Sequence, residues 1–320
     1  MSSHRRLLIL AGLTAALLVC GGPAGAYEFT RDLQAGDTGK DVKALQVRIA
    51  GFYPTRDPES FSIDGTFGGQ TEAALKNFQR RHELEQTAVA DASVFELLNA
   101  LQDADGSTEH FDYSEFEQNF NSSCSARANA SAGSFAGGPI GKRLVKRNVK
   151  RLMWRLEAVR MKGGSRPVGI NSGYRSVAYN DCIGGARASQ HMYGTAADNR
   201  MAEVSNRRER NLARWSQISG IGCYSNKTHN HFDLRVENTK LSSSRAFWWP
   251  EVDKQGRHLD ETGRPCWGEV RTARTPLRTT AMVLREVHTA APGAGSLIAS
   301  VAEIEAFEEA GEVADLGGLD

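Results

Sequence analysis

SQHMYGTAAD, at residues 189–198, is the stretch around which the larger part of this 320-residue chain is organised. It carries one imidazole, at His191, and one carboxylate, at Asp198, with small residues between them. These two positions are too far apart to share a short strand, on which successive side chains alternate between the two faces. We therefore expect Gly194 to provide a turn, because glycine adopts positive φ without steric cost. The turn would fold the loop back so that both side chains converge.

A second stretch, HNHFDLRV at residues 229–236, supplies further imidazole. Its polar side chains alternate with mainly apolar ones, which is typical of a strand with one polar face. Two imidazole nitrogens and one carboxylate oxygen form a ligand set that catalytic zinc takes from protein, with one position left for water. The simpler alternative is a solvated strand face on which each histidine is structural. The polar positions are His229, His231, Asp233 and Arg235.

Together the two stretches resemble the signature of the zinc D-Ala-D-Ala carboxypeptidase family, in its secreted Streptomyces-type branch. The shared pattern is Ser189-x-His191-x-x-Gly194-x-Ala196-x-Asp198 followed by His231, and the likeness runs from about residue 111 to residue 269. The resemblance implies that His191, Asp198 and His231 bind one zinc ion per chain. The run SGYRS at 172–176 also matches, which implies that Arg175 holds the terminal carboxylate of the substrate.

The general base is the position at which this chain departs from the sister branches of the family. Those branches carry a carboxylate three residues before the last ligand, where this chain has Thr228. His229 resembles the His-x-His arrangement of the Streptomyces-type branch, so we expect it to accept the proton of the attacking water or to stabilise the oxyanion. Ser189 and Tyr193 are candidate substrate contacts in the ligand loop, and Asp233 is expected to orient an imidazole.

The N-terminal residues predict export. Arg5 and Arg6 precede an apolar stretch at 7–19 that is too short to span a bilayer, and 24–26 offer small residues for cleavage. We expect a signal peptide over 1–26, a location outside the cell or in the cell wall, and no integral membrane association. In an oxidising compartment the remaining cysteines predict two disulfides, with all three pairings open. These cysteines are Cys124, Cys182, Cys223 and Cys266.

Residues 33–101 predict a small helical domain. Val42, Leu45 and Ile49 form an apolar stripe at helical spacing, and Thr71 is expected to cap a second helix. The turn DGTFG at 64–68 and its neighbours resemble the peptidoglycan-binding domain type 1, a three-helix module, although the usual ending of that motif is degraded at 87–91. The resemblance implies peptidoglycan and its peptide stems as partners. Polar residues at 102–109 predict a linker.

The rest of the chain predicts an α+β fold, in which helices of a catalytic domain at 110–269 pack on a mainly antiparallel sheet. Amphipathic helices are expected over 144–159 and 203–219, and a strand over 168–173. Residues 270–320 are a tail of unknown structure. The net charge of +1 does not suggest a nucleic-acid partner, and a monomer is expected. Basic clusters at 142–155 and 207–214 could touch an anionic wall polymer, although solvated helix faces are the simpler interpretation.

The sequence therefore favours a secreted zinc-dependent D-Ala-D-Ala carboxypeptidase that removes the terminal D-alanine of peptidoglycan stem peptides through a zinc-activated water. One alternative is a zinc endopeptidase that cuts within the stem or cross-bridge, and another is a non-catalytic protein that binds the cell wall. Arg175 favours the first hypothesis, because an endopeptidase gains little from capturing a free carboxylate. His229 argues against the last, because a binding protein needs no base beside its metal.

Overall fold

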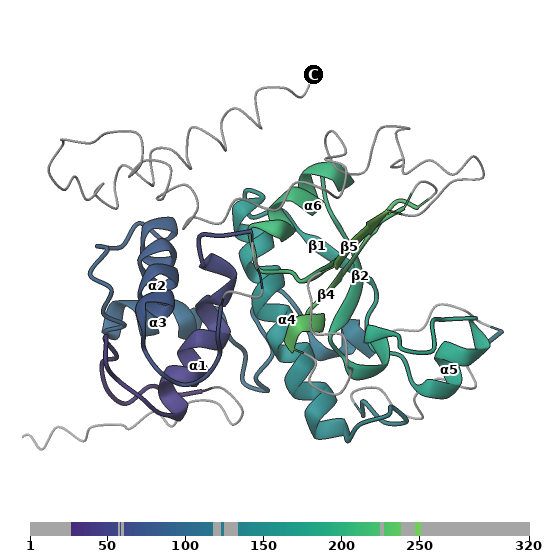
Figure 1. Cartoon of the computed structure of the whole chain (residues 1–320), viewed down its shortest axis with the longest axis horizontal. Helices are drawn as coiled ribbons and strands as arrows, with labels where there is room; N and C mark the ends of the chain where they lie inside the picture. The colour runs from purple at the N-terminus through teal and green to yellow at the C-terminus, as the bar shows by residue number, and fades with distance from the viewer. Residues whose placement is uncertain are drawn as a thin grey trace, which may run out of the picture. The chain divides into compact units, whose positions relative to one another are not determined.

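The computed structural model describes residues 27–56, 58, 61–117, 123–124, 134–224 and 227–237, and the backbone of 247–250. All of them belong to one compact unit, Met1–Gly268. Figure 1 shows a small helical module formed by the first described residues and a larger part in which helices pack on a sheet. The predicted α+β fold is therefore confirmed. The predicted signal peptide at 1–26 and the tail at 270–320 lie outside the described residues.

The module consists of α1 (Lys40–Ile49), the 3₁₀ helix η1 (Ala50–Phe52), α2 (Gly69–Arg81) and α3 (Ala92–Ala100). The predicted apolar stripe of α1 is buried, and it packs against apolar residues of α2 and α3. The side chain of Gln46 accepts a hydrogen bond from Gly65 N, whose residue has φ of 89°, and so fastens the predicted turn to α1. The three-helix expectation is confirmed.

Thr71 does not cap α2, contrary to the sequence prediction. The helix already begins at Gly69, and the N-cap residue Gly68 makes no side-chain cap bond. Thr71 instead lies buried in the first turn, where its hydroxyl accepts a hydrogen bond of 3.0 Å from Gln46 Nε2. A threonine within the first turn can bond to a neighbouring helix as well as to its own backbone, so the sequence pattern did not separate the two roles. Asp91 is the side chain that caps α3.

The larger part is built on a five-stranded sheet with the order β1-β2-β4-β3-β5. Three of its pairings are antiparallel and the pairing of β3 with β5 is parallel, so the sheet is mainly antiparallel as predicted. Two short helices, α5 (Val177–Cys182) and η4 (Gln190–Tyr193), lie between β1 and β2. The strands are β1 (Val168–Ser172), β2 (Ala196–Met201), β3 (Gly220–Cys223), β4 (Asn230–Asp233) and β5 (Phe247–Pro250).

β4 is shorter than the strand that the alternation at 229–236 predicts. His229 precedes it, and Arg235 belongs to the 3₁₀ helix η5 (Arg235–Glu237). The backbone N–H and the guanidinium of Arg235 both donate to the carboxylate of Asp233, which turns the chain out of the sheet. The second predicted helix is shorter too: α6 spans Asn206–Arg214, between the capping residues Ser205 and Trp215.

The long helix α4 (Lys142–Lys162) is shared by two hydrophobic cores, and it includes the predicted stretch 144–159. Val149, Leu152 and Leu156 pack into the core beneath the sheet. Trp154 and Ala158, on another side of the helix, pack into the core of the module. Fully burying a leucine side chain contributes about 1.5–3 kcal/mol, so these two cores fix α4 firmly beneath the strands.

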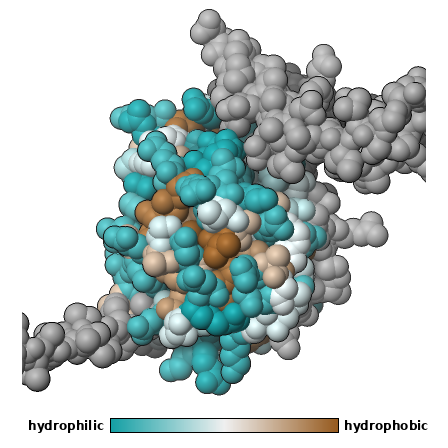
Figure 2. Space-filling view, turned by 90° about the vertical axis from the view of Figure 1, so that its left-hand side faces the viewer, coloured by the Kyte–Doolittle hydropathy of each residue, from teal (hydrophilic) through white to brown (hydrophobic). Residues whose placement is uncertain are grey.

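Residues 102–109, predicted as a linker, form a turn in which Gln102 and Thr108 share a β-bridge. Gln102 also accepts a hydrogen bond of 2.7 Å from the buried guanidinium of Arg48 in α1. Figure 2 shows the face formed by the module, on which hydrophilic residues predominate and smaller groups of apolar residues lie between them. Among the helices that the structure describes, none has both the length and the apolar character required to cross a bilayer.

Candidate metal centre

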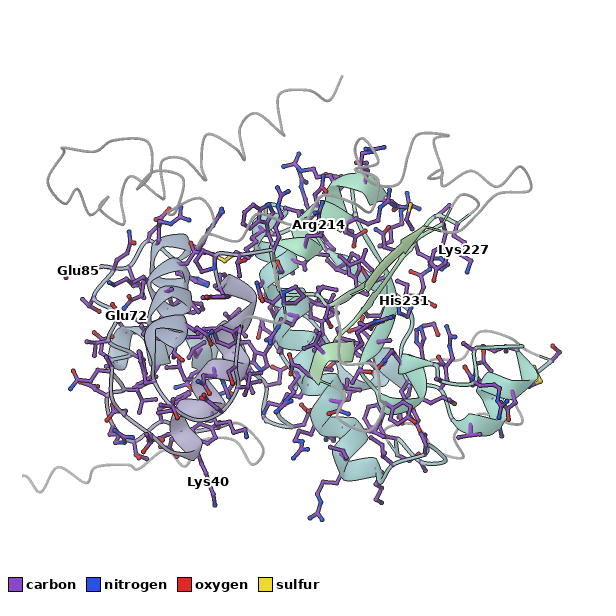
Figure 3. The ribbon with its side chains drawn as sticks, in the orientation of Figure 1. Lys40, Glu72, Glu85, Arg214, Lys227 and His231 are labelled. Atoms are coloured by element: carbon purple, nitrogen blue, oxygen red, sulfur yellow. A yellow bond between two sulfur atoms is a disulfide. The ribbon has the colours of Figure 1, made fainter. Side chains whose placement is uncertain are left out.

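His191, Asp198 and His231 come together on the sheet, as the sequence predicts. His191 lies in η4, and Asp198 and His231 face each other across the pairing of β2 with β4. One ligand atom from each residue lies within 4.8 Å of the other two. His231 Nδ1 is 3.0 Å from Asp198 Oδ1 and 3.1 Å from His191 Nε2, and His191 Nε2 is 3.4 Å from Asp198 Oδ1. Figure 3 labels His231 among the strands of the sheet.

The other nitrogen of each ring faces a group that accepts a hydrogen bond. His191 Nδ1 lies 2.6 Å from the carbonyl oxygen of Gly173, which can only accept. His231 Nε2 lies 3.0 Å from Asp233 Oδ2, a fully buried carboxylate that is also bound by Arg235. Each outer nitrogen therefore carries the hydrogen of its neutral ring. The inner nitrogens, His191 Nε2 and His231 Nδ1, are left as lone-pair donors.

Three electron-pair donors therefore converge, and when both rings are neutral no hydrogen lies between them. Their close approach is reflected in shifted pKa values. Burial, followed by the charge of Arg175, lowers the pKa of His191 to about 4. Burial opposes protonation of His231 too, but its bonds to Asp198 and Asp233 raise its pKa above the usual value. Burial would raise the pKa of Asp198, yet the charges and hydrogen bonds of the two histidines hold it well below its usual range. A cation is the partner that this donor set requires, and its nitrogen and oxygen atoms suit zinc.

Comparison with known proteins agrees with this geometry. Residues 109–233 match the family Peptidase M15, and residues 38–98 match the putative peptidoglycan binding domain. We refer to residues 109–233, which match this family, as the M15 domain. The chain is also 34% identical, over 178 residues, to the zinc D-Ala-D-Ala carboxypeptidase of Streptomyces albus G. That match covers 56% of this chain and 64% of the relative. The resemblance that the sequence motifs indicate is confirmed.

Two solved structures are similar to shorter parts of the chain. The SleB N-terminal domain is 35% identical over 22% of this chain and 93% of its own, with a TM-score of 0.20. A fused Zn-dependent amidase/peptidase/peptidoglycan-binding domain-containing protein from Clostridium acetobutylicum is 23% identical, covers 30% of this chain and 39% of its own, and also has a TM-score of 0.20.

Arg175 of the M15 domain contacts two of the three candidate ligands, Asp198 and His191. Its Nη2 donates to Asp198 Oδ2 over 2.7 Å, and its Nε donates to Ser172 Oγ over 2.9 Å. Its backbone N–H donates to the carbonyl oxygen of His191 over 3.2 Å. Among the described residues only Nη1 of the guanidinium has no partner. Sequence reasoning assigned Arg175 to the substrate, and its bond with Asp198 was not foreseen.

The remaining predicted site residues of the M15 domain lie around this group. Ser189 is largely buried at the N-cap position of η4, although its hydroxyl makes no capping bond. The half-buried Tyr193 ends the same short helix, and its carbonyl accepts from Asn148. His229 is half-buried beside Tyr224, with the ring centroids 6.0 Å apart, and burial lowers its pKa. It is not one of the three residues whose ligand atoms converge.

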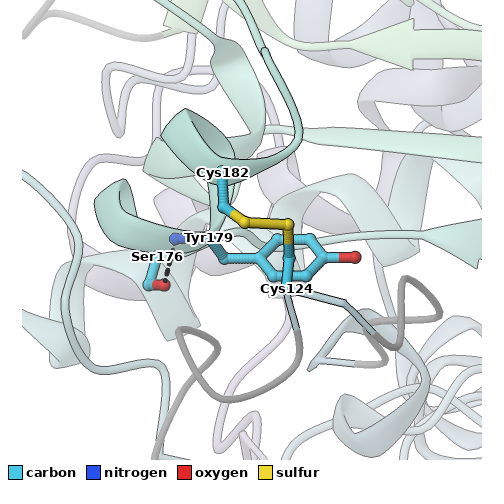
Figure 4. Close-up of a disulfide and its surroundings, with 4 residues drawn as sticks. All are labelled: Cys124, Ser176, Tyr179 and Cys182. Carbon is cyan, nitrogen blue, oxygen red and sulfur yellow. Dashed lines mark hydrogen bonds between the residues drawn. A yellow bond between two sulfur atoms is a disulfide. The ribbon is translucent and has the colours of Figure 1, made fainter.

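The cysteines of the M15 domain form disulfides. Cys124 is bonded to Cys182 at the end of α5, which Figure 4 shows beside Tyr179. Ser176 caps this helix by accepting from Tyr179 N, also drawn in Figure 4. Cys223, at the end of β3, is disulfide-bonded as well. Cys266, the remaining candidate, lies outside the described residues.

Proposed function

We propose that the protein is a zinc-dependent D-Ala-D-Ala carboxypeptidase that hydrolyses the terminal D-alanine of peptidoglycan stem peptides. The observation that carries this proposal is the convergence of two inner ring nitrogens and one carboxylate oxygen within 4.8 Å. The peptidase M15 match and the carboxypeptidase activity named for the Streptomyces albus G relative support the reaction class. We expect one zinc ion per chain.

In this mechanism His191, Asp198 and His231 would hold the zinc ion. When bound, zinc polarises the scissile carbonyl and lowers the pKa of a water molecule to about 7. Asp233 keeps the hydrogen of His231 on Nε2, so that Nδ1 stays available as a ligand. Gly173 fixes His191 in the same way through its carbonyl oxygen. The ring orientations are therefore set before any substrate binds.

Arg175 and His229 supply the remaining chemistry. Arg175 Nη1 is free among the described residues to hold the terminal carboxylate of the peptide, while Nη2 keeps Asp198 in place. His229 accepts the proton of the attacking water and returns it to the leaving amine of D-alanine. Burial lowers the pKa of His229, so the ring is neutral and able to accept a proton near pH 7. Ser189 and Tyr193 border the substrate beside η4.

The helical module is proposed to hold the enzyme on the wall. Its match to the putative peptidoglycan binding domain supports this role. We propose a secreted or wall-associated monomer with a signal peptide over 1–26, the module over 33–101, a linker over 102–109 and the peptidase domain over 110–269. Trp154 and Ala158 of α4 pack in the hydrophobic core of the module, which supports a module held against the peptidase helix.

One observation keeps an endopeptidase as the second candidate. Arg175 spends its Nε–H on Ser172 and one N–H of Nη2 on Asp198, so this side of the guanidinium is not available to a substrate carboxylate. Among the described residues, the two N–H groups of Nη1 and the second N–H of Nη2 remain for the substrate. The carbonyl oxygen of a peptide bond inside a stem or cross-bridge could accept from these groups, as a free carboxylate could.

The test is mass analysis of the products formed by the zinc-loaded protein. A stem peptide that ends in D-Ala-D-Ala is compared with its C-terminal amide and with a cross-linked dimer, each with and without chelator. We expect chelator-sensitive release of D-alanine from the free acid. Cleavage of the dimer at an internal bond would instead assign the endopeptidase activity, and no product from any of the three would leave a wall-binding protein. His229→Ala is expected to retain zinc and to lose turnover by roughly 10²–10⁴-fold.

A further inference from the structure

A cavity bordered by charged side chains lies on α4, and its lining includes none of the three candidate metal ligands. Its volume is about 420 Å³, and the proposed hydrolysis uses none of its lining residues. The turn at 105–106, Tyr113 and the segment 134–135 form part of the lining. The first turns of α4 complete it with Lys142, Arg143, Lys146, Arg147 and Lys150.

The charge of this cavity is not balanced. Five of its lining side chains are cationic and one, Asp105, is anionic, and Asp105 already accepts from the hydroxyl of Ser107. Lys142, Arg143 and Arg147 are exposed, and they make no ion pair with any residue that the structure describes. Burial, and then the charge of Arg48, lowers the pKa of Lys150 to about 8. An anionic ligand would relieve the mutual repulsion of these groups.

The spacing of the cations fits several anions in a row. The pairs 142/143 and 146/147, followed by Lys150, recur every four residues on one side of the helix. One turn of a helix rises about 5.4 Å, and eight residues span about 12 Å. A single anion cannot contact cations over this length. A chain that presents one anion for each turn of the helix can.

The uncharged residues of the lining indicate which groups of the ligand would connect its anions. Tyr113 and Phe135 are buried aromatic side chains, 6% and 1% exposed, and their rings give the cavity an apolar floor. Lys146 Nζ lies 4.1 Å from the centroid of the Tyr113 ring. The hydroxyl of Ser134 is buried and has no partner among the residues that the structure describes, so it is able to donate to a ligand oxygen. These rings expose too little surface to stack on a flat base, but the small apolar floor that they leave suits short carbon spacers, and oxygen-rich anions suit the cations and the hydroxyl.

We propose that this cavity binds a linear phosphodiester chain with short uncharged spacers, as in a polyol phosphate polymer. Each phosphodiester stays ionised and offers oxygen atoms in several directions, which both lysine and arginine bind. A nucleic acid fits less well, because single strands are held by bases that stack on accessible aromatic rings, and both rings here are buried. The site does not depend on the proposed peptidase activity.

The test measures binding of fluorescent poly(glycerol phosphate) of about ten units to the full chain by anisotropy over a series of salt concentrations. Arg143→Gln/Arg147→Gln removes two exposed cations of the cavity, and Lys40→Gln/Arg80→Gln removes two exposed cations of the module as the matched control. We expect the cavity variant to weaken binding by at least tenfold and to reduce the salt slope by about two. The control is expected to change the affinity by less than about twofold. Equal losses in both variants would mean diffuse attraction and overturn the site.

Two further anionic polymers test whether the cavity prefers a polyol phosphate. Poly-L-glutamate of equal charge and a single-stranded oligothymidylate with the same number of phosphates are titrated in parallel, and both are expected to bind more weakly. Tighter binding of either polymer would overturn the assignment to a polyol phosphate. Thermal unfolding and release of D-alanine from a short soluble peptide are expected to be the same in wild type and Arg143→Gln/Arg147→Gln. If the wild type released no D-alanine, the proposed function would fail while the binding result would stand.

Discussion

Replacing Asp233 by asparagine tests whether the buried carboxylate sets the zinc affinity of the site. In the wild type Asp233 is fully buried and accepts from His231 Nε2 over 3.0 Å and from Arg235 Nη2 over 2.6 Å. Asparagine has nearly the same shape but carries no charge, and its amide nitrogen can donate toward His231. That contact would move the ring hydrogen to Nδ1, which is the atom that faces Asp198 and His191.

The size of the effect follows from the role of this carboxylate. Loss of a hydrogen-bond partner behind a metal-ligating histidine typically lowers metal affinity by 10–100-fold. That range corresponds to about 1.4–2.7 kcal/mol of binding free energy. Asp233→Asn also leaves the guanidinium of Arg235 poorly paired, so the metal-free protein is expected to lose stability as well. Zinc affinity therefore has to be measured directly, rather than inferred from the melting temperature alone.

The assay is competition for zinc between the protein and a chromophoric chelator, with the metal content of each variant determined at saturation. Glu157→Gln is the matched control, because Glu157 is another buried carboxylate that contacts a histidine, His110, over 3.1 Å. We expect Glu157→Gln to bind zinc as the wild type does. A Kd for Asp233→Asn within about twofold of the wild-type value would refute the reasoning. An equal loss in Glu157→Gln would show that general destabilisation, and not the contact with His231, lowers the affinity.

Gly220→Ala is expected to lower both stability and zinc affinity, measured by urea unfolding and chelator competition, because its Cβ would collide with the carboxylate of Asp233. Glu209→Gln tests a pH effect: burial raises the pKa of Glu209 to about 7, so the native state keeps a proton that the unfolded chain loses above about pH 4.3. Through this group, the free energy of unfolding of the wild type should fall by roughly 3 kcal/mol between pH 4.3 and 7. In Glu209→Gln, the free energy of unfolding from urea titrations should lack this part of its pH dependence. Cys124→Ser removes the disulfide with Cys182, which closes a loop of 58 residues. The free energy of unfolding, measured by thermal unfolding under oxidising conditions, should fall by about 4 kcal/mol or less.

The convergence of the three candidate ligands could be predicted from sequence, because their residue types and spacing are chemically restrictive. His191 and Asp198 are seven positions apart, and only a turn between them allows convergence, which Gly194 provides with φ of 68°. His231 then had to come from a neighbouring strand, and it lies opposite Asp198 in the β2/β4 register. The alternation at 229–236 placed His231 and Asp233 on the same side of the chain, which is why their contact was expected.

Other features depend on contacts that the local sequence does not encode. The length of β4 is set by the bonds between Arg235 and Asp233, whereas alternation alone predicted a longer strand. Thr71 bonds to Gln46 of another helix instead of capping its own. Arg175 binds Asp198, a residue 23 positions away, because β1 and β2 pair side by side. Each correction comes from a neighbour that becomes close only after the sheet or module has formed.

The small residues of these motifs make room for the groups that fix the two rings. A Cβ on Gly173 would lie 2.5 Å from backbone atoms of Phe116, and the carbonyl of this glycine holds His191. A Cβ on Gly220 would collide with the carboxylate that holds His231. A larger residue at either position would move a hydrogen-bond acceptor, and with it the ring hydrogen that keeps an inner nitrogen available. Glycine at these two positions therefore preserves the geometry of the candidate metal site, although neither residue is one of the three candidate ligands.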